Sequence, residues 1–171
     1  MKTAFGPRVE QSVRNCTPVF LTLALVFIGL APFPAPGYVQ VTPMLTLVSV
    51  YYWSIYRPDL LPLAATFCIG LMQDVLIGTP LGMSALVLLL VQGAVVAQRR
   101  FFLGKTFVVV WCCFMLVAPA AAVVSWLLAS LYHWTIMEPR LLLFQHVVTI
   151  LIYPCLTWFF AVAHKRLVAK A

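Results

Sequence analysis

The stretch GLMQDVLIGTPLG, Gly70 to Gly82, places one of the chain's four acidic residues inside an apolar run. Thr66, Gly70, Asp74 and Gly78 recur every four residues, a spacing that aligns side chains along one face of a helix. Small residues on such a face let a second helix approach closely. The short GTPLG segment then predicts a reversal of the chain, so the apolar segments on either side should form an antiparallel helical hairpin.

The carboxylate of Asp74 needs partners, because insertion of an aspartate at the centre of a membrane helix costs roughly 2.5–3.5 kcal/mol. Ser84 follows the turn, should return to a similar depth, and can hydrogen-bond the carboxylate. His146, in the last apolar segment, is a second candidate at comparable depth. Three interpretations stay open: a buried clamp for the hairpin, a docking point for a partner's helix, and proton or substrate handling.

The composition predicts a polytopic membrane protein. Of 171 residues, 64% are hydrophobic and 9% charged, with a mean hydropathy of +1.04, too little polar surface for a soluble domain. We expect an all-α bundle of six transmembrane helices, preceded by a cytoplasmic arm (1–17) and followed by a basic tail (164–171). Within the membrane domain (18–163), the apolar segments lie at about 18–31, 42–56, 60–77, 81–97, 106–131 and 142–163.

The basic residues predict the orientation. If the N-terminus is inside, Arg140 is the one cation of the eleven Lys and Arg residues that falls outside. The positive-inside rule then places both termini in the cytoplasm. Arg99, Arg100 and Lys105 are a candidate cytoplasmic contact, with a solvated loop as the alternative. The net charge of +7 therefore follows from topology. Contact with anionic headgroups or an acidic cytoplasmic partner stays open, and the segment RVEQSVRN has no interleaved aromatic residues, which argues against nucleic acid.

Prolines and aromatic residues fall at informative positions in the expected helices. Pro43 opens the second segment, whereas Pro119 and Pro154 fall inside the fifth and sixth. An internal proline should kink its helix and free a carbonyl that needs a donor from a neighbouring helix or water. Aromatic residues near segment ends are expected to be interfacial anchors: Tyr51, Tyr52, Trp53 and Tyr56, and at the other side Tyr132 and Trp134.

Together, Pro43, the Gly70 to Gly82 run and Pro154 before a basic tail resemble the MreD family. MreD is the small inner-membrane subunit of the bacterial rod-shape and cell-wall elongation machinery. The family pattern is G-L-x-x-D-x-x-x-G-x-x-x-G. This sequence matches it at Gly70, Leu71, Asp74, Gly78 and Gly82, and the resemblance covers about residues 40 to 165.

The resemblance implies a protein that is not an enzyme and needs no cofactor. Members act with the bitopic scaffold protein MreC and, through it, with a RodA-type polymerase and its transpeptidase. Actin-like MreB filaments are linked to the same assembly through an indirect contact. The fold is expected to be similar to that of the substrate-binding subunits of energy-coupling-factor vitamin transporters. The implied function is scaffolding of peptidoglycan synthesis in the inner membrane.

That fold likeness supplies the main alternative, a substrate-binding subunit of such a transporter. Many of those subunits carry an A-x-x-x-A pattern on the first helix, but here Ala24 is followed four residues later by Ile28. The turn at Arg57 to Asp59 is also too short to serve as a recognition loop.

An intramembrane enzyme is the third class. An aspartyl protease needs a second carboxylate within the membrane, and the other acids (Glu10, Asp59 and Glu138) fall in different loops. That separation also argues against a metal site for phosphoryl transfer. The GMSA sequence around Ser84 is a weak match to any nucleophile motif. The five cysteines show no C-x-x-C spacing, so no metal or disulfide role is expected.

Overall fold

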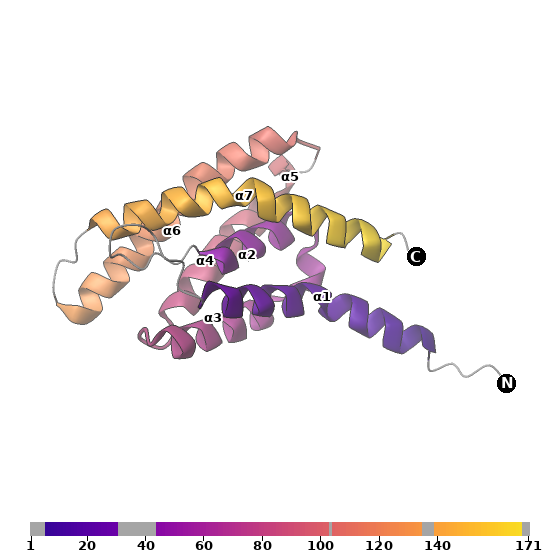
Figure 1. Ribbon diagram of the computed structural model, residues 1–171, viewed down its shortest axis with the longest axis horizontal. Coiled ribbons are helices and arrows are strands. Elements are labelled where there is room, and N and C mark those ends of the chain that lie inside the picture. Colours follow the sequence, from indigo (N-terminus) through magenta and orange to yellow (C-terminus); the bar gives the residue numbers. More distant parts are fainter. Residues whose placement is uncertain (1–5, 31–43, 103, 135–138, 169–171) are drawn as a thin grey trace.

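The computed structural model describes residues 6–30, 44–102, 104–134 and 139–168, with side chains described at 17–30, 44–102, 104–134 and 145–162. The regular structure in these residues is entirely helical, as expected for an all-α protein (Figure 1). The elements are α1 (Gly6–Gly29), α2 (Leu45–Tyr56), the 3₁₀ turn η1 (Pro58–Leu60), α3 (Leu63–Ile77), α4 (Met83–Ala97), α5 (Arg99–Phe102), α6 (Phe107–His133) and α7 (Pro139–Val168).

Five of the six apolar segments coincide closely with α2, α3, α4, α6 and α7. The first was expected to begin at Pro18, but α1 begins at Gly6 and runs through the polar stretch RVEQSVRN, with Pro18 inside it. The helix is longer than the apolar segment, because apolar character marks burial or lipid contact, whereas a helix continues wherever its backbone bonds are made. The predicted domain boundaries near residues 17 and 163 thus fall within continuous helices, and the domain division stays a prediction.

Two described segments are long and apolar enough to cross a membrane, Phe107–His133 and Gln145–Val162. Three shorter apolar helices accompany them: Thr17–Gly29, Leu63–Ile77 and Met83–Ala97. Tyr132 and Trp134 are exposed at the end of α6, as interfacial anchors require.

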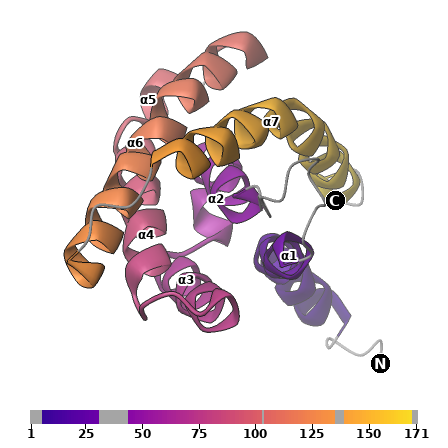
Figure 2. The same cartoon turned by 60° about the vertical axis from the view of Figure 1, so that its left-hand side comes forward.

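Helix α2 forms the centre of the bundle. Eleven consecutive residues, Leu45–Ile55, are buried, so the helix is enclosed on every side. Figure 2 shows α1, α3, α4, α6 and α7 arranged around it. A helix that is apolar all round belongs in such a position. Its 12 residues span about 18 Å, well short of the roughly 30 Å hydrocarbon core of a bilayer.

The aromatic residues of α2 are mostly core residues, so the prediction of interfacial anchors was wrong for three of the four. Tyr51, Tyr52 and Trp53 are buried, and Tyr56 alone of the four is exposed, at 38%. The Tyr51 hydroxyl donates to the Val110 carbonyl at 3.0 Å. Its ring meets rings from α5, α6 and α7: Phe102, Phe114 and Tyr153. The central position of α2 turns these side chains toward neighbouring helices rather than toward an interface.

The internal proline of α7 has the compensation that was expected. Pro154 lacks the N–H that would bond the Ile150 carbonyl. The indole Nε1–H of Trp111 in α6 donates to that carbonyl at 3.4 Å. A neighbouring helix thus supplies the donor, as predicted. Pro119 lies inside α6, Pro62 is the N-cap of α3, and Pro43 lies outside the described residues.

Candidate functional site

The α3–α4 hairpin turns through two glycines of the sequence motif. Gly78 ends α3 with φ +78°, and its N–H donates to the Asp74 carbonyl at 2.9 Å. Gly82 is the N-cap of α4 with φ +95°. Side chains rarely tolerate this left-handed backbone, so glycine is favoured at both positions. The motif spacing therefore encodes a tight helix-to-helix turn.

The Asp74 carboxylate caps the helix that follows it. Its side chain is fully buried. Oδ1 accepts from the Thr79 hydroxyl at 2.8 Å and from the Ser84 N–H at 3.0 Å, and Oδ2 accepts from the Gly82 N–H at 2.9 Å. The first N–H groups of a helix have no partner within it and favour an anion. Gly82 has no side chain that could accept hydrogen bonds from these N–H groups, so the Asp74 carboxylate from α3 accepts them instead. This is the geometry of the predicted clamp.

Of the two predicted partners of Asp74, the structure brings one to the carboxylate. Ser84 donates, but through its backbone N–H rather than the hydroxyl that the sequence suggested. His146 is buried in α7 and is not among the three donors. Thr79 and Gly82 were not expected as donors, although a threonine directly after a helix-ending glycine is a signal for a capping turn.

The small-residue stripe on α3 packs against α4 of the same chain. A Cβ placed on Gly70 would lie 2.3 Å from the Ala85 Cα. Thr66, Gly70 and Asp74 are buried, whereas Gly78 is exposed and Leu71 is partly buried. The interpretation of this stripe as a groove for a partner's helix was therefore wrong, because α4 occupies that face.

The basic residues near α5 divide into two kinds. Arg99 Nε donates to the Ile55 carbonyl at 3.1 Å and so caps the C-terminal end of α2. Arg100 and Lys105 are exposed, and the Lys105 Nζ lies 5.5 Å from the centroid of the Phe101 ring. Arg99 thus has a structural role, while Arg100 and Lys105 stay candidates for a cytoplasmic contact.

Among the described residues, no group of three or more His, Cys, Asp or Glu side chains is placed to hold a metal ion. The cysteines with described side chains are free thiols: Cys68, Cys112, Cys113 and Cys155.

The family model for the rod shape-determining protein MreD matches residues 12–166. The chain belongs to the MreD family. The resemblance carried by the hairpin motif is thereby confirmed, and the matched region includes the whole hairpin as well as Pro43 and Pro154. No curated protein and no solved structure matches the chain.

MreD membership makes the chain a rod shape-determining protein of the inner membrane, and its apolar helices agree with that location. The family is structural rather than a known enzyme family, and it is associated with the rod-shape complex. The match gives no support to the alternative of a transporter's substrate-binding subunit.

Proposed function

We propose that this MreD protein is a non-catalytic subunit of the cell-wall elongation complex that scaffolds peptidoglycan synthesis together with an MreC-like bitopic protein. The family match over residues 12–166 is the observation that carries the proposal. A RodA-type polymerase and its transpeptidase are the expected further members, reached directly or through the MreC-like protein. Actin-like MreB filaments join indirectly.

The proposal includes a topology of six membrane crossings with both termini in the cytoplasm. Two features support it: each of the six apolar segments of the sequence coincides at least in part with one helix, and six crossings from an inside N-terminus leave one of the eleven Lys and Arg residues of the sequence outside. The short α2 is accommodated because the surrounding helices, rather than lipid, cover it. We propose that the arrangement is similar to that of the energy-coupling-factor transporter subunits.

The surface offered to a partner's membrane helix lies on α6. The α3 stripe is already covered by α4, whereas α6 exposes bulky apolar residues along its length. Leu116, Leu127 and Leu131 are 75%, 54% and 66% exposed. Lipid alone would cover such a face equally well, so the experiment must distinguish a partner's helix from lipid as the cover of α6.

The test is affinity purification of the tagged full-length chain from native membranes in mild detergent, with bound proteins identified by mass spectrometry. Recovery of an MreC-like protein with the polymerase and transpeptidase is the expected result. Recovery of a coupling subunit with paired ATPases would overturn the proposal.

A matched pair of variants locates the partner. Leu116→Ala removes bulk from α6, where Leu116 is 75% exposed, and Leu63→Ala removes the same bulk from α3, where Leu63 is 58% exposed. The α6 variant should recover less of the MreC-like protein, while the α3 variant recovers as much as the unchanged chain. Equal recovery from both variants would exclude α6 as the contact face.

A further inference from the structure

The cationic side chains that the structure describes gather at one end of the bundle. All of the Lys and Arg residues with described side chains are there: Arg57, Arg99, Arg100 and Lys105. Arg57 follows α2, Arg100 lies in α5, and Lys105 precedes α6. The hydrogen bond from Arg99 to the Ile55 carbonyl joins the α5 end to the end of α2. Figure 1 shows α5 toward the same side of the molecule as the end of α7, with the α3–α4 turn toward the opposite side.

Three of these cations are exposed, namely Arg57, Arg100 and Lys105. No salt bridge links any of them to a carboxylate within the part of the chain whose side chains are described. The one carboxylate described at this end is Asp59 in η1, and it is exposed as well. Four cations against one carboxylate leave an excess of positive charge, which attracts an anion to this end of the bundle.

An exposed aromatic ring lies among the cations. Phe101 is 54% exposed, whereas the adjacent Phe102 is 6% exposed and its ring centroid lies 6.1 Å from that of Tyr51. Phe102 thus anchors α5 to the core and leaves Phe101 outside. The Lys105 Nζ lies 5.5 Å from the centroid of the Phe101 ring. An exposed ring beside a cation suits a membrane interface, where the ring meets the acyl boundary and the charge stays among the headgroups.

An exposed apolar surface begins directly after this group. Phe107 and Val108, in the first turn of α6, are 40% and 55% exposed, and Leu116 farther along the helix is 75% exposed. Lys105 precedes Phe107 by two residues, so a lipid whose acyl chain lies along the start of α6 has its headgroup near Lys105. A soluble acidic partner would leave these apolar residues without a contact, whereas a lipid with an anionic headgroup meets both surfaces.

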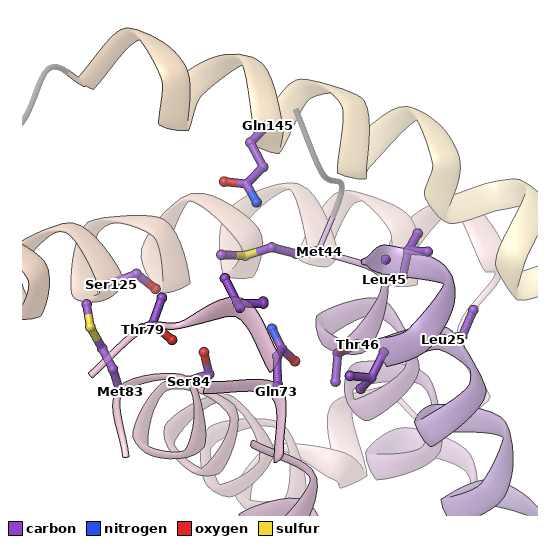
Figure 3. Close-up of a pocket in the computed structure, with 13 residues that line it drawn as sticks. Leu25, Met44, Leu45, Thr46, Gln73, Thr79, Met83, Ser84, Ser125 and Gln145 are labelled. Atoms are coloured by element: carbon purple, nitrogen blue, oxygen red, sulfur yellow. The ribbon is translucent and has the colours of Figure 1, made fainter. Parts of the chain in front are cut away.

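The opposite end of the bundle has no comparable group of cations among the side chains that can be described. There a cavity of about 310 Å³ lies between the α3–α4 turn and α7, and the described residues that line it are uncharged. Figure 3 shows Gln73, Ser84 and Gln145 among its polar side chains. The charged side chain described near that end is the buried Asp74 carboxylate, which repels anions. An anionic headgroup is therefore attracted to the α5 end.

We propose that the α5 patch, made of Arg57, Arg100, Phe101 and Lys105, binds the headgroup of an anionic phospholipid. The Arg100 guanidinium and the Lys105 ammonium donate to the phosphate oxygens, and Arg57 adds to the positive potential. The Phe101 ring packs against the start of the acyl chains. The chemistry of the patch does not rest on the proposed scaffold function. The proposed topology decides only that the cytoplasmic leaflet supplies the lipid.

The test is native mass spectrometry of the purified full-length chain after incubation in mild detergent with phosphatidylglycerol and phosphatidylcholine of identical acyl chains. Both probes carry a phosphate, but the choline group cancels its charge in phosphatidylcholine. We expect phosphatidylglycerol to be retained in preference by about tenfold or more, since each basic residue near a headgroup strengthens the attraction roughly fivefold.

A matched pair of charge variants locates the binding. Arg100→Gln removes an exposed cation of the patch, and Arg140→Gln removes the same charge from the start of α7. Arg100→Gln should weaken phosphatidylglycerol retention about fivefold, and adding Lys105→Gln should remove most of the preference over phosphatidylcholine. Arg140→Gln should keep that preference. Arg100 and Lys105 are exposed, so these variants should fold, and thermal unfolding in the same detergent checks this.

A second pair tests the apolar part of the patch. Phe101→Ala removes the ring but keeps every charge, and it should lower phosphatidylglycerol retention about threefold or more. Phe27→Ala is the control, because Phe27 is also 54% exposed but lies on α1, next to the cavity-lining Val26 at the opposite end of the bundle. The control should retain as much phosphatidylglycerol as the unchanged chain.

Three results would overturn the proposal. Equal retention of the two lipids by the unchanged chain would mean that apolar contact alone holds them. Equal losses in Arg100→Gln and Arg140→Gln would show an effect of net charge rather than of the patch. A cytoplasmic protein lost on affinity purification of the double variant, with lipid preference intact, would assign the patch to an acidic protein. None of these results depends on recovery of an MreC-like protein, so failure of the scaffold proposal is read separately.

Discussion

Two helix ends near the opposite ends of α4 are capped by opposite charges: the N-terminus of α4 at the hairpin, and the C-terminus of α2 beside Arg99. At the hairpin end (residues 77–83), the Asp74 carboxylate accepts the free N–H groups that begin α4. At the α5 end (residues 55–61 with Arg99), side chains donate to backbone carbonyls that have no partner within a helix. Arg99 donates to the Ile55 carbonyl, and the Gln92 amide donates to the Leu61 carbonyl at 2.7 Å. An anion thus lies at a helix N-terminus and a cation at a helix C-terminus, as the helix dipole favours.

The ends differ in how many bonds depend on one side chain. Asp74 is fully buried and accepts three bonds, whereas Arg99 is partly exposed and donates one. Water can replace a bond at the α5 end but cannot reach the Asp74 side chain. The hairpin end is therefore expected to be the more sensitive to substitution. Asp74→Ala and Arg99→Ala test that difference, and Gly70→Leu tests the close packing of α3 on α4 that supports the hairpin.

The largest effect is expected for Gly70→Leu. Its Cβ would meet the Ala85 backbone at 2.3 Å, and backbone atoms cannot move aside as a flexible side chain can. We expect a loss of about 3 kcal/mol or more in the free energy of unfolding, measured by tryptophan fluorescence during thermal unfolding in mild detergent. Gly93→Leu is the control, because a Cβ at Gly93 has nothing within 4 Å. Equal melting of the two variants would contradict the close approach of α3 and α4.

A smaller but still large effect is expected for Asp74→Ala. The substitution leaves the Gly82 and Ser84 N–H groups and the Thr79 hydroxyl without their acceptor, at a cost of about 2–3 kcal/mol. Asp74→Asn keeps one carbonyl oxygen and should lie between the alanine variant and the unchanged chain. The same unfolding measurement checks the order, and an alanine variant as stable as the asparagine variant would show that the carboxylate does not cap α4.

The smallest effect is expected for Arg99→Ala at the α5 end. It removes one partly exposed bond to the Ile55 carbonyl, so the loss should be below about 1 kcal/mol. Arg100→Ala is the matched control, since Arg100 is exposed and should change stability less. A loss as large as that of Asp74→Ala would remove the difference between the two ends.

The sequence predicted most of the helices because long apolar runs mark them directly. It did not indicate that α1 continues through a polar stretch, and its prediction was wrong at α2, where Tyr51, Tyr52 and Trp53 are buried. Aromatic residues near a helix end suit an interface or a core equally well by composition. Only the packing of later helices around α2 decides between them.

For the hairpin, the sequence identified Asp74 and the glycines but not how they act. The donors to Asp74 are mostly backbone N–H groups, whose direction depends on the dihedral angles at Gly82 rather than on residue type. Gln73, Ser125 and Gln145 are visible as polar residues in apolar runs, yet their convergence on one cavity depends on the arrangement of three separate helices.

The burial of α2 has a consequence for biogenesis. The second helix of the chain to be synthesised is the one that ends at the centre, and much of its enclosure comes from α4, α6 and α7. The Met44 N–H that begins it bonds the Thr149 hydroxyl of the last helix at 3.1 Å. A nascent chain therefore cannot complete its core until translation is nearly finished. Until α7 is made, lipid rather than protein has to cover that side of α2, so the last packing step of the core follows the synthesis of the last helix.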